Sequence, residues 1–147
     1  MKHERKKIMI VDDNVTNLTT GKEMLRDKYK VYPIPSAVVM FDLLKSISPD
    51  LILLDIEMPV TNGYDALRRL KDEPKWADIP VIFLTAKTDE GSELEGLSLG
   101  AIDYVTKPFS APLLLKRIEN YLISESRKRR LDEYIAVYGE IAVNDSQ

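Results

Sequence analysis

Two continuous apolar runs constrain this chain more than any other feature of its sequence. Residues 51–54 (LILL) and 81–84 (VIFL) contain no polar residue and no alternation of polar and apolar positions. Strands of this kind are covered on both faces, which is typical of parallel sheets flanked by helices. Asp55 follows the first run directly, so a strand that is buried on both faces ends on a carboxylate.

Strand-like runs alternate with helix-like segments from residue 7 to about residue 122. Asn14, Ser36 and Ser110 stand where helix N-caps are expected, and Pro33 suggests an edge strand. Five successive βα units predict an α/β fold, a doubly wound parallel sheet with right-handed crossovers. The expected strands are residues 7–11, 30–34, 51–54, 81–85 and 101–105, and the expected helices begin near residues 14, 36, 62, 89 and 110.

Composition excludes several classes of protein and site. The chain has 147 residues, enough for one domain, and a formal net charge of -3, which does not favour binding to nucleic acid. It has no cysteine, and its single histidine, His3, lies in a polar stretch. Thiolate metal sites and Ser-His or Cys-His catalysis are therefore not expected. Because no apolar stretch approaches the roughly 18 residues of a membrane span, we expect a cytoplasmic protein with no membrane contact.

Polar residues that could carry chemistry follow four of the five expected strands. In parallel sheets the carboxyl ends of the strands lie at one edge, where α/β folds bind their ligands. We therefore expect these side chains to converge, although each alone is compatible with a solvated turn or strand end. They are Asp12 and Asp13 after the first strand, Asp55 after the third, Thr85 at the end of the fourth and Lys107 after the fifth.

The chemistry of this set points to phosphoryl transfer. Three carboxylates in one crevice stay ionised together only if a cation neutralises them, and an all-oxygen site favours Mg²⁺, or Mn²⁺ in its place. Lys107 adds a point charge suited to phosphate, and the hydroxyl of Thr85 can donate to an oxyanion. An aspartate in such a site can act as a nucleophile and form an aspartyl phosphate.

Four motifs resemble the receiver domains of two-component response regulators: IMIVDDN (8–14), LILLDIEMPVTNG (51–63), VIFLTA (81–86) and GAIDYVTKPF (100–109). The resemblance covers residues 6–123. It implies a flavodoxin-like (βα)5 fold with strand order 2-1-3-4-5. It also implies that Asp55 accepts a phosphoryl group from a histidine kinase or phosphotransfer protein, so the chain would be a signalling phosphoacceptor rather than an enzyme acting on other substrates.

The resemblance also implies a role for each metal-binding residue. Asp13 and Asp55 would bind Mg²⁺ directly together with the backbone carbonyl of Glu57, and Asp12 would act mostly through water. Lys107 would contact the phosphoryl group, and its peptide bond to Pro108 would be cis.

Two further residues are implied as a switch. Thr85 would move toward the phosphoryl group, and Tyr104 would swing inward in response. The affected surface would be formed by the fourth helix, the fifth strand and the fifth helix, and it would act on an output domain or a downstream protein.

The tail, residues 124–147, is expected to be helical over about 127–142, either as an extension or as a linker to an output domain that this chain lacks. The basic run 127–130 has acidic neighbours and indicates a solvated helix face rather than a nucleic-acid site. An apolar stripe at helical spacing must be buried against the receiver, a second copy or an output domain. The stripe comprises Leu131, Tyr134, Ile135, Tyr138 and Ile141.

Two other functions are compatible with parts of this pattern. A haloacid-dehalogenase-like phosphatase also uses an aspartyl phosphate, Mg²⁺ and a lysine, but it normally has two aspartates two positions apart after its first strand, whereas Asp12 and Asp13 are adjacent. A receiver-like interaction module that is never phosphorylated is the other alternative, and the complete set of site residues counts against it.

Overall fold

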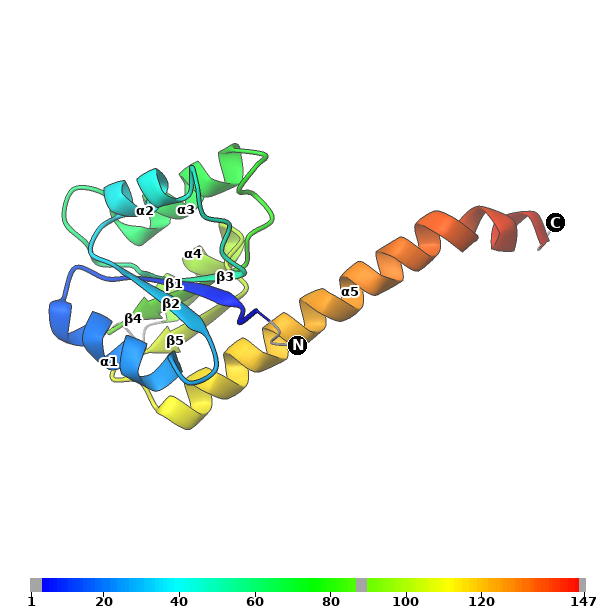
Figure 1. Ribbon diagram of the computed structural model, residues 1–147. Helices are drawn as coiled ribbons and strands as arrows, with labels where there is room; N and C mark the ends of the chain where they lie inside the picture. The colour runs from blue at the N-terminus through cyan, green and yellow to red at the C-terminus, as the bar shows by residue number, and fades with distance from the viewer. Residues whose placement is uncertain (1–3, 87–89, 146–147) are drawn as a thin grey trace.

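A five-stranded parallel sheet forms the centre of the molecule (Figure 1). The computed structural model describes residues 4–86 and 90–145. The side chains of residues 90–93 and 140–145 lie outside the described part, and so does His3. The strand order is β2-β1-β3-β4-β5, as expected. The elements are β1 Lys7–Val11, α1 Val15–Leu25, β2 Lys30–Ile34, α2 Ala37–Leu43, β3 Leu51–Asp55, α3 Gly63–Asp72, β4 Val81–Thr85, α4 Glu90–Ser98, β5 Asp103–Thr106 and α5 Ala111–Asp145.

Helices cover both faces of the sheet, which explains the unbroken apolar runs. Every residue of β3 and β4 is buried. Alternate residues along each strand face opposite sides: Leu54 and Phe83 lie in the cluster under α2 and α3, whereas Leu53 and Leu84 lie in the cluster with α1 and α5. Burial of this kind holds the ends of the strands in fixed positions.

Two of the predicted capping residues cap their helices: the side chains of Asn14 and Ser36 accept backbone N–H bonds from Asn17 and Val39. Asn62, which the sequence analysis placed only at the start of the third helix, accepts a bond from the backbone N–H of Asp65 in the same way. Pro33 lies in β2, which is an edge strand, as predicted. The expected start of the fourth helix at residue 89 lies outside the described residues.

The fifth strand begins at Asp103, two residues later than the sequence predicts. Gly100 adopts a positive φ of 108° at the end of α4. The backbone N–H of Ala101 then donates to the carbonyl of Gly96, 3.2 Å away. Residues 100 and 101 therefore terminate the helix, as glycine commonly does at this position, and do not extend the strand.

One continuous helix replaces the expected fifth helix and separate tail helix. α5 runs from Ala111 to Asp145 and leaves the body of the molecule (Figure 1). The helical tail is confirmed, but burial of its stripe on the receiver of the same chain is wrong: Leu131, Tyr134, Ile135 and Tyr138 are between 50% and 61% exposed. Ile141 has its side chain outside the described residues. Despite the length of α5, the described part of the chain contains no helix that could span a membrane.

Gly63 provides a test of how tightly the fold holds the functional edge of the sheet. A Cβ at this position would lie 2.5 Å from the carbonyl oxygen of Asp55 and 2.8 Å from Cα of Ile56. Gly63→Ala should therefore lower the free energy of unfolding by about 1–3 kcal/mol, because backbone must move to relieve the contact. Urea denaturation measures this value.

Gly139→Ala is the matched control. There the added Cβ meets only the side chain of Ile135, at 3.1 Å, and alanine is the better helix former by about 0.5–1 kcal/mol. Equal loss of stability in the two variants would contradict the proposed close packing of α3 against the end of β3.

Candidate functional site

The carboxyl ends of β1, β3 and β5 place a cluster of charged side chains at one edge of the sheet. Asp12 and Asp13 follow β1, Asp55 is the last residue of β3, and Lys107 follows β5. All four border a cavity of about 280 Å³. Its other lining residues are Asn14, Asn17, Glu57 and Ala86.

The three aspartates lie close enough to share one cation. One carboxylate oxygen from each of Asp12, Asp13 and Asp55 lies within 4.8 Å of the others. Asp12 and Asp55 are buried, with 0% and 4% of their surface exposed, whereas Asp13 is exposed. Two buried carboxylates beside a third one repel each other strongly, since little water screens them.

Lys107 compensates the two buried charges. Its Nζ lies 2.7 Å from Oδ2 of Asp12 and 3.1 Å from Oδ1 of Asp55. Its backbone N–H donates to the carbonyl of Thr85, 2.7 Å away, which fixes the residue to the end of β4. The Lys107–Pro108 peptide bond is cis, as predicted.

The pKa values of this pair reflect burial and mutual attraction. Burial, followed by repulsion from Asp12, raises the pKa of Asp55 from 3.8 to about 6, although Lys107 and the backbone of Glu57 oppose the change. Burial alone would lower the pKa of Lys107, but hydrogen bonds and charge from Asp12 and Asp55 outweigh it and raise the pKa. Lys107 is therefore a firmly protonated cation, whereas Asp55 is a carboxylate whose negative charge is only partly compensated.

Two asparagines at the start of α1, the capping residue Asn14 and Asn17 of the first turn, hold Asp12 in place. The side-chain Nδ2 of Asn17 donates to Oδ2 of Asp12 at 3.1 Å, and the backbone N–H of Asn14 donates to Oδ1 at 2.9 Å. Sequence analysis identified Asn14 only as a helix cap and missed Asn17. Asn17 lies in the first turn of the helix that follows Asp12 and Asp13, and this position could have indicated that it contacts the aspartates.

Glu57 borders the cavity from the loop after β3. Its backbone N–H donates to Oδ1 of Asp55 at 3.4 Å, and this contact helps to orient the carboxylate. The predicted role of its backbone carbonyl as a metal ligand stays a prediction.

The two predicted switch residues lie beside the cavity rather than in its lining. Thr85 is fully buried at the end of β4, in register with Thr106 of β5. Tyr104 lies in β5 opposite Phe83 and packs, partly buried, against the core cluster under α2 and α3. Their predicted movements remain predictions.

The donor atoms of the site suit a hard divalent cation. Asp12, Asp13 and Asp55 offer carboxylate oxygens that lie close together at one polar cavity, and oxygen donors are the ligands that Mg²⁺ prefers. Burial and, after it, repulsion from Asp12 raise the pKa of Asp55 despite the contact with Lys107, so a further positive charge at the site would be favourable. The residues present therefore fit Mg²⁺.

Comparison with known proteins places this arrangement in one family. The family model for the response regulator receiver domain matches residues 8–119. A probable cyclic di-GMP phosphodiesterase of Vibrio cholerae is 40% identical over 82% of this chain and 27% of its own length. The polar-differentiation response regulator DivK of Brucella ovis is 34% identical over 80% of this chain and 96% of its own.

A solved structure shows the same architecture. The receiver domain of sensor histidine kinase PA1611 from Pseudomonas aeruginosa, described with a magnesium ion coordinated in its active-site cleft, has a TM-score of 0.74 and 29% identity, covering 80% of this chain and 98% of that one. The chain spans about a third or less of the first four curated relatives that it matches. With its parallel sheet in the order β2-β1-β3-β4-β5 and a family match over residues 8–119, this chain belongs to the response regulator receiver domains of two-component signalling.

Proposed function

We propose that this receiver domain takes a phosphoryl group onto Asp55 from the phosphohistidine of a histidine kinase or phosphotransfer protein. The observation that carries the proposal is the position of Asp55: a buried carboxylate 3.1 Å from the Lys107 ammonium and within 4.8 Å of two further carboxylates. A purely structural carboxylate at a strand end needs neither the neighbouring pair Asp12 and Asp13 nor a partly buried lysine in contact with it.

The transfer is an in-line displacement at phosphorus. A carboxylate oxygen of Asp55 forms a bond to phosphorus while the phosphorus–nitrogen bond of the donor breaks, and the released imidazole takes up a proton from solvent. Since the pKa of Asp55 is about 6, the nucleophile is largely ionised at neutral pH. The Lys107 ammonium would then exchange its contact with Asp55 for the oxygens of the phosphoryl group.

Asp13 and Asp55 would hold Mg²⁺ together with the backbone carbonyl of Glu57, while Asp12 acts mainly through water. When bound, the ion supplies positive charge beside the oxygens of the transferred group. The convergence of the three carboxylates supports this assignment, as does the magnesium ion described for the PA1611 receiver domain. Mn²⁺ has the same preference for oxygen ligands and could replace Mg²⁺.

The phosphorylated site would act on other proteins through the face formed by α4, β5 and α5. Thr85 ends the strand next to Asp55, and Tyr104 follows in the neighbouring strand. A phosphoryl group that attracts the Thr85 hydroxyl would leave space for the Tyr104 ring to move inward.

The proposed receiver unit is residues 6–123, with residues 124–147 as a tail. This boundary falls inside the continuous helix α5.

The haloacid-dehalogenase-like alternative fits the site less well. Its nucleophile would be an aspartate after the first strand, in a pair spaced two positions apart, whereas Asp12 and Asp13 are adjacent. Both carboxylate oxygens of Asp12 are also engaged, by Lys107, Asn17 and the backbone of Asn14. The receiver proposal therefore assigns the nucleophile to Asp55. The chain is proposed to be a cytoplasmic signalling phosphoacceptor.

The first test of this function is covalent labelling. Acetyl phosphate with Mg²⁺ should add one phosphoryl group to the wild-type protein, detected by intact mass, and a chelator should prevent the addition. Asp55→Asn should remove the adduct without unfolding the protein, because the amide is nearly isosteric with the carboxylate. Asp42→Asn, an exposed carboxylate in α2, is the matched control and should label normally.

Two results would contradict the assignment. One is full labelling of the Asp55→Asn variant at another residue. The other is wild-type protein that stays unmodified while Mg²⁺ and the phosphodonor are both in excess.

The raised pKa of Asp55 predicts how the stability of the metal-free protein depends on pH. Between about pH 4 and pH 6 the folded protein retains a proton on Asp55 that the unfolded chain has released. The free energy of unfolding should therefore fall as pH rises through this window, by up to about 3 kcal/mol from this group. Denaturation in a chelating buffer at several pH values measures the slope, and Asp55→Asn should remove this contribution. A wild type and variant with parallel pH profiles would contradict the predicted shift.

A further inference from the structure

The cavity at Asp55 carries an unbalanced set of charges. Among the described residues that line it, one is basic, Lys107, and four are acidic. The acidic residues are Asp12, Asp13, Asp55 and Glu57. An excess of negative charge attracts a divalent cation, but it also destabilises the folded protein while the cation is absent.

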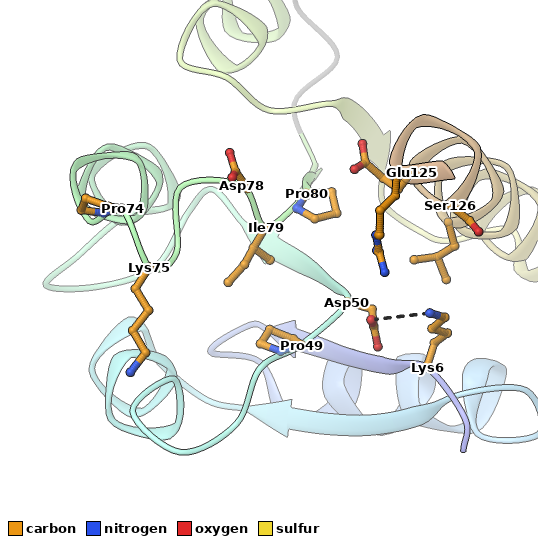
Figure 2. Close-up of a pocket in the computed structure, with 12 residues that line it drawn as sticks. Lys6, Pro49, Asp50, Pro74, Lys75, Asp78, Ile79, Pro80, Glu125 and Ser126 are labelled. Atoms are coloured by element: carbon orange, nitrogen blue, oxygen red, sulfur yellow. Dashed lines mark ion pairs between the residues drawn. The ribbon is translucent and has the colours of Figure 1, made fainter. Parts of the chain in front are cut away.

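A second cavity shows that such an excess is not general in this molecule. It lies between α5 and the amino edge of the sheet and has a volume of about 320 Å³, against about 280 Å³ at Asp55 (Figure 2). Its described lining holds three basic residues, Lys6, Lys75 and Arg129, and three acidic ones, Asp50, Asp78 and Glu125. Lys6 and Asp50 lie 3.9 Å apart and form the ion pair marked in Figure 2. The excess is therefore a local feature of the cavity at Asp55.

Helix α1 borders the cavity at Asp55 without adding a charge to it. Residues 14–21 contain no charged side chain, and the first one in α1 is Lys22, in the last turn. Asp12 nevertheless receives two hydrogen bonds from this helix start, from the backbone N–H of Asn14 to Oδ1 at 2.9 Å and from Nδ2 of Asn17 to Oδ2 at 3.1 Å. Both donors are uncharged, so they hold the carboxylate without cancelling its negative charge.

Asn17 and Lys107 contact the same oxygen of Asp12. Nζ of Lys107 lies 2.7 Å from Oδ2, the atom to which Nδ2 of Asn17 donates. Because Asp12 is fully buried, water does not replace a donor that it loses, and each loss costs free energy. When Lys107 turns toward a phosphoryl group, as proposed above, the amide of Asn17 stays on Oδ2.

We propose that Asn17 is a positioning residue of the metal site, a neutral donor that keeps the Asp12 carboxylate in place and leaves its charge available to a divalent cation. The inference rests on the proposed function, because it requires the three aspartates to hold Mg²⁺. A leucine at position 17 would remove the donor. A lysine would keep a donor but add positive charge, and it would therefore compete with the metal ion.

Asn17→Lys should move two measurements in opposite directions. In a chelating buffer the added cation should attract the aspartates and raise the midpoint of thermal unfolding above that of the wild type. In a titration with Mg²⁺ followed by NMR chemical shifts, the same variant should bind the ion at least about tenfold more weakly, because two positive charges then share one cavity. A merely structural Asn17 would make the variant less stable and leave the affinity of the folded protein unchanged.

Asn17→Leu tests the hydrogen-bond donor alone. Leucine is close to asparagine in volume and carries no charge, but it cannot donate to Asp12. The midpoint of unfolding without metal should therefore fall, and the affinity for Mg²⁺ should fall with it, by roughly threefold.

Thr19→Lys is the matched control for the added charge. Thr19 is exposed, and its hydroxyl donates to the Val15 carbonyl of the same helix at 3.0 Å. Two residues correspond to about 200° of helical rotation, which places Thr19 on the opposite side of α1 from Asn17. The affinity of this variant for Mg²⁺ should differ from that of the wild type by less than about twofold, since solvent and salt screen an exposed charge.

Three results would overturn the inference and leave the proposed function intact. They are wild-type affinity for Mg²⁺ in the Asn17→Lys variant, equal loss of affinity in Asn17→Lys and Thr19→Lys, and a metal-free Asn17→Lys protein that is less stable than Thr19→Lys. A wild type that binds no Mg²⁺ would overturn the metal site of the proposed function, and this inference with it.

Discussion

The contact of the Lys107 ammonium with two buried carboxylates is the interaction on which the functional edge of this protein depends. Nζ lies 2.7 Å from Asp12 and 3.1 Å from Asp55, and both aspartates are almost fully removed from solvent. One cation cannot neutralise three carboxylates, and burial together with repulsion from Asp12 keeps the pKa of Asp55 raised even beside Lys107. A bound cation would therefore stabilise the three carboxylates. Once it is bound, the Lys107 ammonium could contact another group.

The rest of the fold holds these charges together. Repelling carboxylates move apart unless their backbones are fixed, and here each is attached to a strand end inside a close-packed core. β3 has no exposed residue, Gly63 lets α3 approach the carbonyl of Asp55, and Asn17 anchors Asp12 from the first turn of α1. Burial of the sheet on both faces thus supplies the rigidity that the electrostatics of the site require.

The sheet and most of the charged cluster could be predicted because both depend on local sequence patterns. Unbroken apolar runs give parallel strands, and parallel strands bring Asp12, Asp55 and Lys107 to one edge. The contact of Asn17 with Asp12 could not be predicted, since it depends on the angle at which α1 leaves β1. The late start of β5 follows from the left-handed Gly100. The continuity of α5 was predictable in principle, because between Pro112 and Gly139 the sequence has neither proline nor glycine. We instead expected two helices because we placed a domain boundary after residue 123.

We expect Lys107 to compensate the buried carboxylates until a cation and a phosphoryl group take its place beside them. A crystal structure with Mg²⁺ and beryllium trifluoride, a mimic of the phosphoryl group, would show whether this exchange occurs. In that structure the ion should bind Asp13, Asp55 and the Glu57 carbonyl, the trifluoride should bind Asp55, and the Lys107 ammonium should contact a fluorine atom. An ion bound elsewhere, or Lys107 still paired with Asp55 while the trifluoride is bound, would contradict it.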